Sequence, residues 1–193
     1  MKIFNPAPFT KINSQDYLLV IAPSEEVITQ VREFKRIATK MIGFFPSFNS
    51  KAHITINHYY DRNALYFDDR VATYRNMISK IDSFDITVCG FDHFEHQNTY
   101  TIFARVELNP NITSTFFKFR KVFGADVRNT PHITIARSLT YTQFKTLWDH
   151  FKNLKFECSF YTEEIVVLKA PIQAFHEYLP MEVETIFPLK KML

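Results

Sequence analysis

Two short segments of this chain each carry a histidine followed, two residues later, by a threonine. They are His53–Ile56 and His132–Ile135, and both read His-Ile-Thr-Ile. Two imidazoles that face one substrate can act as general acid and general base near neutral pH without a metal ion. Threonine hydroxyls can donate hydrogen bonds to oxygens on which charge develops. The sequence therefore predicts an acid–base site built from His53, Thr55, His132 and Thr134.

Each tetrapeptide has β-branched residues at three of its four positions, which favours a strand. In a strand, the histidine and threonine point to one face while the two isoleucines point to the other. A single copy would be an ordinary structural strand. The second copy begins 79 residues later, and a polar segment precedes each copy, 50–52 and 129–131. The recurrence predicts a duplicated half-domain that brings both His/Thr pairs to one shared cleft.

The remaining elements are expected to position these two strands. The spacing of apolar residues predicts four helices, one beginning after an N-cap at Ser24 and the others spanning Asp69–Ile81, Ile112–Phe123 and Tyr141–Leu154. Further strands are expected at Tyr17–Ala22, Phe84–Phe91, Thr99–Leu108, Phe156–Tyr161, Ile165–Ala170 and Val183–Phe187, with a hairpin loop at Asp92–Asn98. Each half then runs strand, helix, His-Ile-Thr-Ile strand, helix, strand. We expect an α+β fold, bilobal and duplicated, with two mostly antiparallel sheets and flanking helices around a central cleft, in one domain over residues 1–193.

Composition narrows the class of protein. The chain has 193 residues, of which 46% are hydrophobic and 22% charged, as in ordinary soluble globular proteins. Its three glycines are too few for the glycine-rich loops of nucleoside triphosphatases or dinucleotide-binding dehydrogenases. The net charge of +3 suits an anionic ligand. No segment resembles a signal peptide or a transmembrane helix, so we expect a cytoplasmic protein.

The other candidate residues carry weaker signals. Cys89 and Cys158 are predicted to be buried free thiols, and no cluster has metal-ligand spacing. The run from His93 to His96 matches neither common zinc motif, and we expect it in a surface loop. His58 has no motif context. Three basic residues lie among the phenylalanines of 116–123, and we expect them on the solvated face of an amphipathic helix and not on a nucleic-acid surface: Lys118, Arg120 and Lys121.

The pair of H-x-T-x motifs, about 80 residues apart on strands of a duplicated α+β fold, resembles the 2H phosphoesterase superfamily. Its LigT-like branch of 2′-5′ RNA ligases and cyclic phosphodiesterases is the most similar, because the second motif continues with Ala136 and Arg137. The first motif instead continues Asn57-His58-Tyr59-Tyr60, where that branch usually has Phe-Leu-Gly.

The resemblance implies hydrolysis of 2′,3′-cyclic or 2′-5′ phosphodiesters of RNA or small nucleotides, with His53, Thr55, His132 and Thr134 as the catalytic set. It also implies a phosphate contact from Arg137, which an unbroken strand would project to the opposite face from His132. We expect a monomer that needs no cofactor and no metal ion and has no membrane partner. Two alternatives stay open: RNA 2′-5′ ligation by the same site, and a non-catalytic nucleotide- or RNA-binding module.

Overall fold

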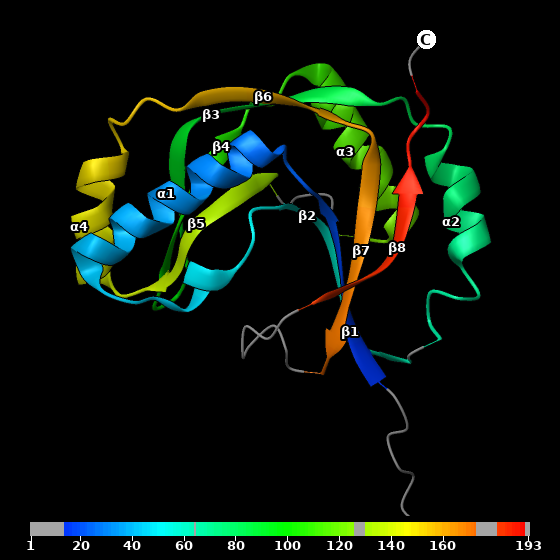
Figure 1. The fold of residues 1–193 in the computed structure, drawn as a ribbon, viewed down its shortest axis with the longest axis horizontal. Coiled ribbons are helices and arrows are strands. Elements are labelled where there is room, and N and C mark those ends of the chain that lie inside the picture. Colours follow the sequence, from blue (N-terminus) through cyan, green and yellow to red (C-terminus); the bar gives the residue numbers. More distant parts are fainter. Residues whose placement is uncertain (1–13, 64, 126–129, 173–180, 192–193) are drawn as a thin grey trace, which may run out of the picture.

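The fold was analysed in a computed structural model that describes residues 14–63, 65–125, 130–172 and 181–191 (Figure 1). Eight strands form one sheet in the order β6-β3-β4-β5-β2-β1-β7-β8. The strands are β1 Ser14–Ile21, β2 Ile54–Asn63, β3 Phe84–Glu95, β4 Tyr100–Val106, β5 His132–Leu139, β6 Glu157–Thr162, β7 Glu164–Pro171 and β8 Glu182–Pro188. The helices are α1 Glu25–Ile42, α2 Val71–Ile78, α3 Pro110–Phe123 and α4 Tyr141–Phe151, with a 3₁₀ turn η1 at Pro46–Asn49.

The sheet consists of two four-stranded halves joined at its centre. The first half-sheet is β2-β1-β7-β8 and the second is β5-β4-β3-β6. All the strand pairings in the described residues are antiparallel, and the two halves meet through one paired position, Ile54 opposite Ile133. The expected α+β fold with mostly antiparallel strands is confirmed. The two sheets predicted from the sequence are the halves of one twisted sheet.

The four helices bury their apolar stripes in one core on one face of this sheet. α1 and α4 cover the second half-sheet, and α2 and α3 cover the first (Figure 1). The duplicated halves therefore exchange helices: α1 precedes β2 in the chain but packs beside β5, whereas α3 precedes β5 and packs beside β2. Within the described ranges, no helix packs on the opposite face, which we call the open face.

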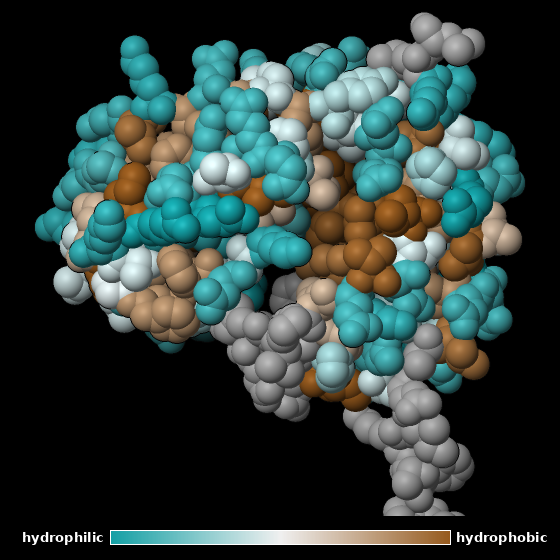
Figure 2. All heavy atoms as spheres, in the orientation of Figure 1, coloured by the Kyte–Doolittle hydropathy of each residue, from teal (hydrophilic) through white to brown (hydrophobic). Residues whose placement is uncertain are grey.

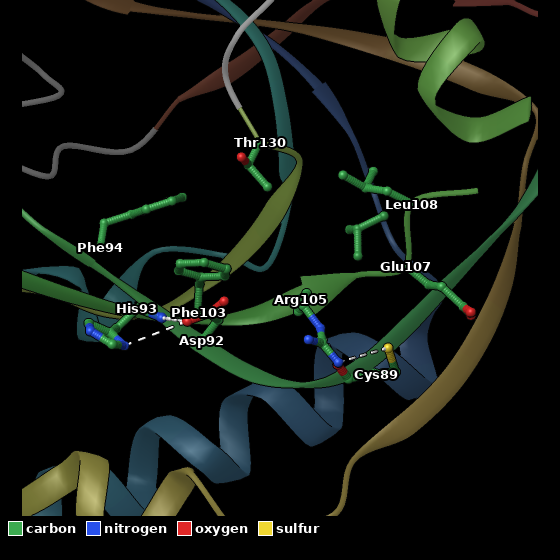
Figure 3. Close-up of a pocket in the computed structure, with 10 residues that line it drawn as sticks. Cys89, Asp92, His93, Phe94, Phe103, Arg105, Glu107, Leu108 and Thr130 are labelled. Carbon is green, nitrogen blue, oxygen red and sulfur yellow. Dashed lines mark hydrogen bonds and ion pairs between the residues drawn. The ribbon is translucent and has the colours of Figure 1, made fainter. Parts of the chain in front are cut away.

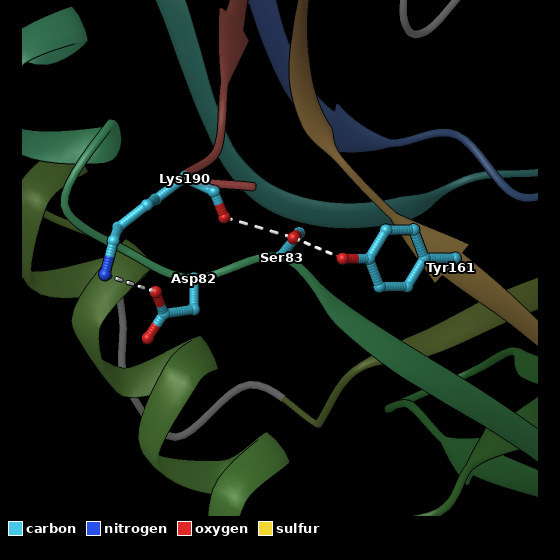
Figure 4. A network of polar contacts seen from close by, with 4 residues as sticks. All are labelled: Asp82, Ser83, Tyr161 and Lys190. Atoms are coloured by element: carbon cyan, nitrogen blue, oxygen red, sulfur yellow. Dashed lines mark hydrogen bonds and ion pairs between the residues drawn. The ribbon is translucent and has the colours of Figure 1, made fainter. Parts of the chain in front are cut away.

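A second contact ties the half-sheets together away from their central junction (Figure 4). Lys190, just after β8, pairs with Asp82, just before β3, through an ion pair of 3.0 Å. The Lys190 carbonyl accepts hydrogen bonds from the Ser83 backbone (2.8 Å) and hydroxyl (3.1 Å), and that hydroxyl also contacts Tyr161 of β6. The end of β8, the outermost strand of the first half-sheet, is thus bound to the start of β3 in the second half-sheet.

Local signals explain the element boundaries. Ser24 caps α1 by accepting from the Val27 backbone, as expected, and Thr140 with Gln143 forms a capping box on α4. The predicted hairpin loop is too long, because β3 continues to Glu95 and pairs with Tyr100. The helix expected over Asp69–Ile81 is shorter, since residues up to Arg70 form turns before α2. None of the helices among the described residues combines the length and the apolar character needed to cross a membrane.

Candidate active site

The two His-Ile-Thr-Ile segments meet at the central junction of the sheet. Ile54 and Ile133 lie opposite each other, occupy the same position in each repeat, and are fully buried against the helices. An approximate two-fold axis therefore runs through this pair. Side chains alternate along each strand, so the histidine and threonine on either side of each isoleucine point to the open face. His53, Thr55, His132 and Thr134 are all half-buried there.

Each histidine ring is held by its own approach segment in the same way. His53 Nδ1 lies 2.8 Å from the Lys51 carbonyl, and His132 Nδ1 lies 2.8 Å from the Thr130 carbonyl. A carbonyl can only accept, so each Nδ1 carries the hydrogen and the neutral ring presents a lone pair at Nε2. Both imidazoles can thus offer Nε2 to a ligand, with ring orientation fixed by the backbone.

The surroundings of both histidines favour the neutral form. Burial lowers the pKa of His53 to about 4; the Lys51 carbonyl raises it, and the charges of Lys35, His132 and Arg137 lower it further. Burial also lowers the pKa of His132, with a smaller contribution from Arg120. The influence of His132 on His53 places the two rings within electrostatic range of each other. A neutral imidazole near pH 7 is the form that a general base requires.

Each histidine has a pKa that is lowered by the charge of a buried residue on a helix. Lys35 of α1 is 3% exposed, and Arg120 of α3 is 4% exposed with its guanidinium over the Phe116 ring. The ammonium of Lys35 donates to the carbonyls of Ser47 (2.9 Å) and Ser50 (2.6 Å) and to the Ser50 hydroxyl (2.9 Å), which fixes the loop that leads to His53. Arg120 was expected on a solvated basic face, and that expectation is wrong.

Replacing Lys35 by methionine is expected to lower the free energy of unfolding by about 1–3 kcal/mol, because the Ser47 and Ser50 carbonyls lose a buried donor. Loss of the charge should also raise the pKa of His53, which Lys35 lowers. Denaturant melts and an NMR titration of His53 measure the two effects. Lys40→Met, on the exposed side of the same helix, is the matched control and should change neither. Equal effects from both variants would contradict the role assigned to Lys35.

A β-bulge decides where Arg137 points. On β4, Ile102 and Phe103 are adjacent, but their partners on β5 are Ala136 and Thr134, so Ile135 is an extra residue. Ile135 and Ala136 are consequently both buried, and Arg137 returns to the open face with Thr134. An unbroken strand would have sent it to the helices. Arg137 also lowers the pKa of His53, which places its charge near that imidazole.

A cavity of about 360 Å³ adjoins His132 on the second half-sheet (Figure 3). Phe94 and Phe103 line it, stacked with ring centroids 4.3 Å apart, and their centroids lie 5.0 and 4.9 Å from the His132 ring. Thr130 and Arg105 also line the cavity. Arg105 Nε donates to the Cys89 carbonyl at 3.3 Å. The cavity lies beside β3 and β4, so it extends the site away from the central junction. Figure 2 shows a hollow in the surface between the two halves of the molecule.

The run around His93 belongs to β3 and not to a surface loop. The His93 ring packs against Phe144 and Trp148 of α4, with ring centroids 5.0 and 4.7 Å apart. Both His93 and the next residue, Phe94, line the cavity. No three His, Cys, Asp or Glu side chains of the described residues gather as metal ligands would. Cys89 and Cys158 are free thiols, each partly buried.

Comparisons with known proteins agree with this architecture. Residues 23–171 match the family model of the 2′-5′ RNA ligase superfamily. No curated protein sequence matches the chain. Among solved structures, TT0787 of Thermus thermophilus is 15% identical, with a TM-score of 0.64 over 92% of this chain and 100% of its own. E. coli LigT in complex with 3′-AMP is 10% identical, with a TM-score of 0.63 over 91% of this chain and 98% of its own. Usb1 of Kluyveromyces marxianus is 10% identical, with a TM-score of 0.53 over 92% of this chain and 99% of its own. These likenesses are in fold, and the family match covers most of the chain: the protein belongs to the 2′-5′ RNA ligase superfamily of 2H phosphoesterases.

Proposed function

We propose that this protein is a metal-independent phosphoesterase that hydrolyses 2′,3′-cyclic or 2′-5′ phosphodiesters of RNA or small nucleotides. One observation carries the proposal. Two repeat-related imidazoles, each tethered through Nδ1 to a carbonyl two residues earlier, present Nε2 on one face of the sheet beside a cavity. The E. coli relative LigT has been crystallised with 3′-AMP and with ATP, and a nucleotide ligand for this chain is in keeping with that.

The surroundings of the two histidines suggest different roles. The charges of Lys35 and Arg137, and that of His132 when it is protonated, oppose a positive charge on His53, whereas Arg120 opposes one on His132. His53 is therefore the better general base. His132 is the better general acid, because the negative charge of a bound phosphodiester favours its protonated form.

In hydrolysis of a 2′,3′-cyclic phosphate, a water oxygen bonds to phosphorus as His53 Nε2 takes a proton from that water. The bond from phosphorus to one ribose oxygen breaks, and His132 gives that oxygen its proton. The product is a phosphomonoester with a free neighbouring hydroxyl, and both rings return to their starting forms by exchange with solvent. Cleavage of a 2′-5′ linkage uses the same proton transfers, with the ribose 3′-hydroxyl as nucleophile and the 5′-oxygen as leaving group.

Thr55, Thr134 and Arg137 are proposed to hold the phosphate between the histidines. The hydroxyls can donate to the non-bridging oxygens, and the guanidinium offsets the charge that builds on them. All three lie on the open face with the histidines.

The direct test is an assay of the purified protein on 2′,3′-cyclic nucleotides and 2′-5′ dinucleotides, with the position of the product phosphate determined by NMR. A single regioisomer is expected from each cyclic nucleotide, because one fixed acid can reach only one ribose oxygen. Absence of turnover on the whole panel would count against the proposed reaction.

Chelation of divalent metals is expected to leave turnover unchanged, since the two-histidine mechanism moves both protons without a Lewis acid. The measurement is the rate before and after exhaustive treatment with EDTA and dialysis. Loss of activity that a divalent ion restores would replace the proposed mechanism with a metal-assisted one.

A further inference from the structure

We propose that His58 and Tyr60 form a stacking platform for a second nucleoside, so that the preferred substrate carries a nucleoside on each side of the scissile phosphate. This inference rests on the proposed function and specifies its substrate class.

His58 occupies the same place in the first repeat as Arg137 in the second, five residues after the motif histidine. β2 and β5 each contain a β-bulge at the same position of the repeat. On β1, Leu19 and Val20 are adjacent, but their partners on β2 are Asn57 and Thr55, which makes Ile56 the extra residue. Ile56 and Ile135 are both the last residue of their tetrapeptide.

The bulge brings His58 onto the open face. His58 lies opposite Leu18, and Thr55 lies opposite Val20, so His58 and Thr55 share a face. The residues between and beyond them point the other way. Asn57 and Tyr59 both donate to the Phe123 carbonyl at the end of α3, on the helix-covered face.

Tyr60 returns to the open face and packs on His58. The two ring centroids are 3.8 Å apart with an interplanar angle of 38°, and Tyr60 is still 53% exposed. Partial burial raises the pKa of the Tyr60 hydroxyl; the charge of Asp16, on its own half-sheet, also raises it, and that of Arg137, on the other, lowers it. The pair is therefore a preformed aromatic surface that faces Arg137 across the site.

The opposite end of the site has a second aromatic surface. Phe94 and Phe103 stack on each other next to His132 and line the cavity of about 360 Å³. The histidine pair lies between these two surfaces, since Thr55 and His58 follow His53 along β2 and Phe103 lies opposite Thr134 of β5. Aromatic side chains bind nucleobases of any sequence by stacking. A cyclic mononucleotide has one base and can use one surface, whereas a dinucleotide can use both.

The test compares kcat/KM for 2′-5′-linked diadenosine monophosphate and for adenosine 2′,3′-cyclic phosphate. Tyr60→Ala should lower the value for the dinucleotide by roughly 10- to 100-fold, the size of one base–aromatic stack, and should lower the dinucleotide-to-cyclic ratio by nearly as much. Tyr60→Phe should restore most of the loss, because it retains the ring. Tyr141→Ala is the control, since that tyrosine is 62% exposed on α4, which covers the other face.

An equal fall on both substrates, or no fall on either, would overturn the platform. Binding of the same dinucleotide, measured by calorimetry, separates this proposal from the reaction itself. A wild-type protein that turns over neither substrate but binds the dinucleotide more tightly than Tyr60→Ala does would overturn the reaction and support the platform. Equal binding by the two proteins would overturn the platform whatever the turnover. Thermal melts confirm that each variant is folded.

Discussion

Replacing either motif histidine by alanine should reduce kcat for a 2′,3′-cyclic nucleotide by on the order of 10²–10⁴-fold, the usual contribution of one positioned proton-transfer group. Each change removes one of the two proton transfers that the reaction needs. The double variant, His53→Ala with His132→Ala, should be little worse than the weaker single variant, because groups that act as a unit are not additive. Thr55→Ala and Thr134→Ala should cost less, since each removes one donor to the phosphate and leaves both transfers in place.

His150→Ala is the matched control for these variants, because His150 is an exposed histidine on α4. It should retain the wild-type rate. Melting curves must show that every variant is folded, which we expect because the side chains lie on the open face. A folded His53→Ala or His132→Ala protein with the wild-type rate would leave only a nucleotide-binding role.

The second large effect should come from a substrate whose leaving group needs no acid. A nucleoside 2′-(4-nitrophenyl) phosphate releases nitrophenolate unprotonated when its 3′-hydroxyl attacks phosphorus, which matches the 2′-5′ linkage of the proposed substrates. His132→Ala should therefore act on this ester within about tenfold of the wild type, although it loses on the order of 10²–10⁴-fold on the cyclic nucleotide. His53→Ala should be impaired on both substrates, because the attacking hydroxyl still has to lose its proton.

Release of nitrophenolate is followed by its absorbance, and the wild-type protein on the same ester provides the reference. Recovery in His53→Ala instead of His132→Ala would reverse the acid and base assignments while keeping the two-histidine mechanism. Recovery in neither would show that the lost rate comes from misplaced phosphate and not from a missing proton donor.

The strands, the helices and the two motifs could be predicted from the sequence because each follows from local spacing. The side on which Arg137 lies could not, because one extra residue in β5 reverses the alternation after Thr134. A repeat comparison would have helped: Arg137 and His58 stand at the same offset from their histidines. That match is visible in the printed sequence. The bulges that turn both side chains to the open face are defined by pairing with β1 and β4, which the sequence alone does not show.

The buried cations could have been found from helical spacing. Lys35 continues the buried stripe of Val27, Val31 and Ala38, and Arg120 lies one turn after Phe116. A charged residue on an apolar stripe is a signal for a buried, partnered group. The partners themselves, such as the Ser47 and Ser50 carbonyls, come from a loop whose path the sequence does not dictate.

Because the two repeats exchange helices, we expect that neither repeat can fold by itself. A fragment that ends after β3 would contain β1 and β2 but lack α3, which covers β2, and its own α1 would lack β5, the strand beside which it packs. The complementary fragment would contain β5 without α1, and its α3 would lack β2. Neither fragment could bury its apolar strands, so collapse of the core requires contacts between residues far apart along the chain, which slows folding. We therefore expect the two repeats to fold as one unit, in which His53 and His132 come together only when both halves have assembled.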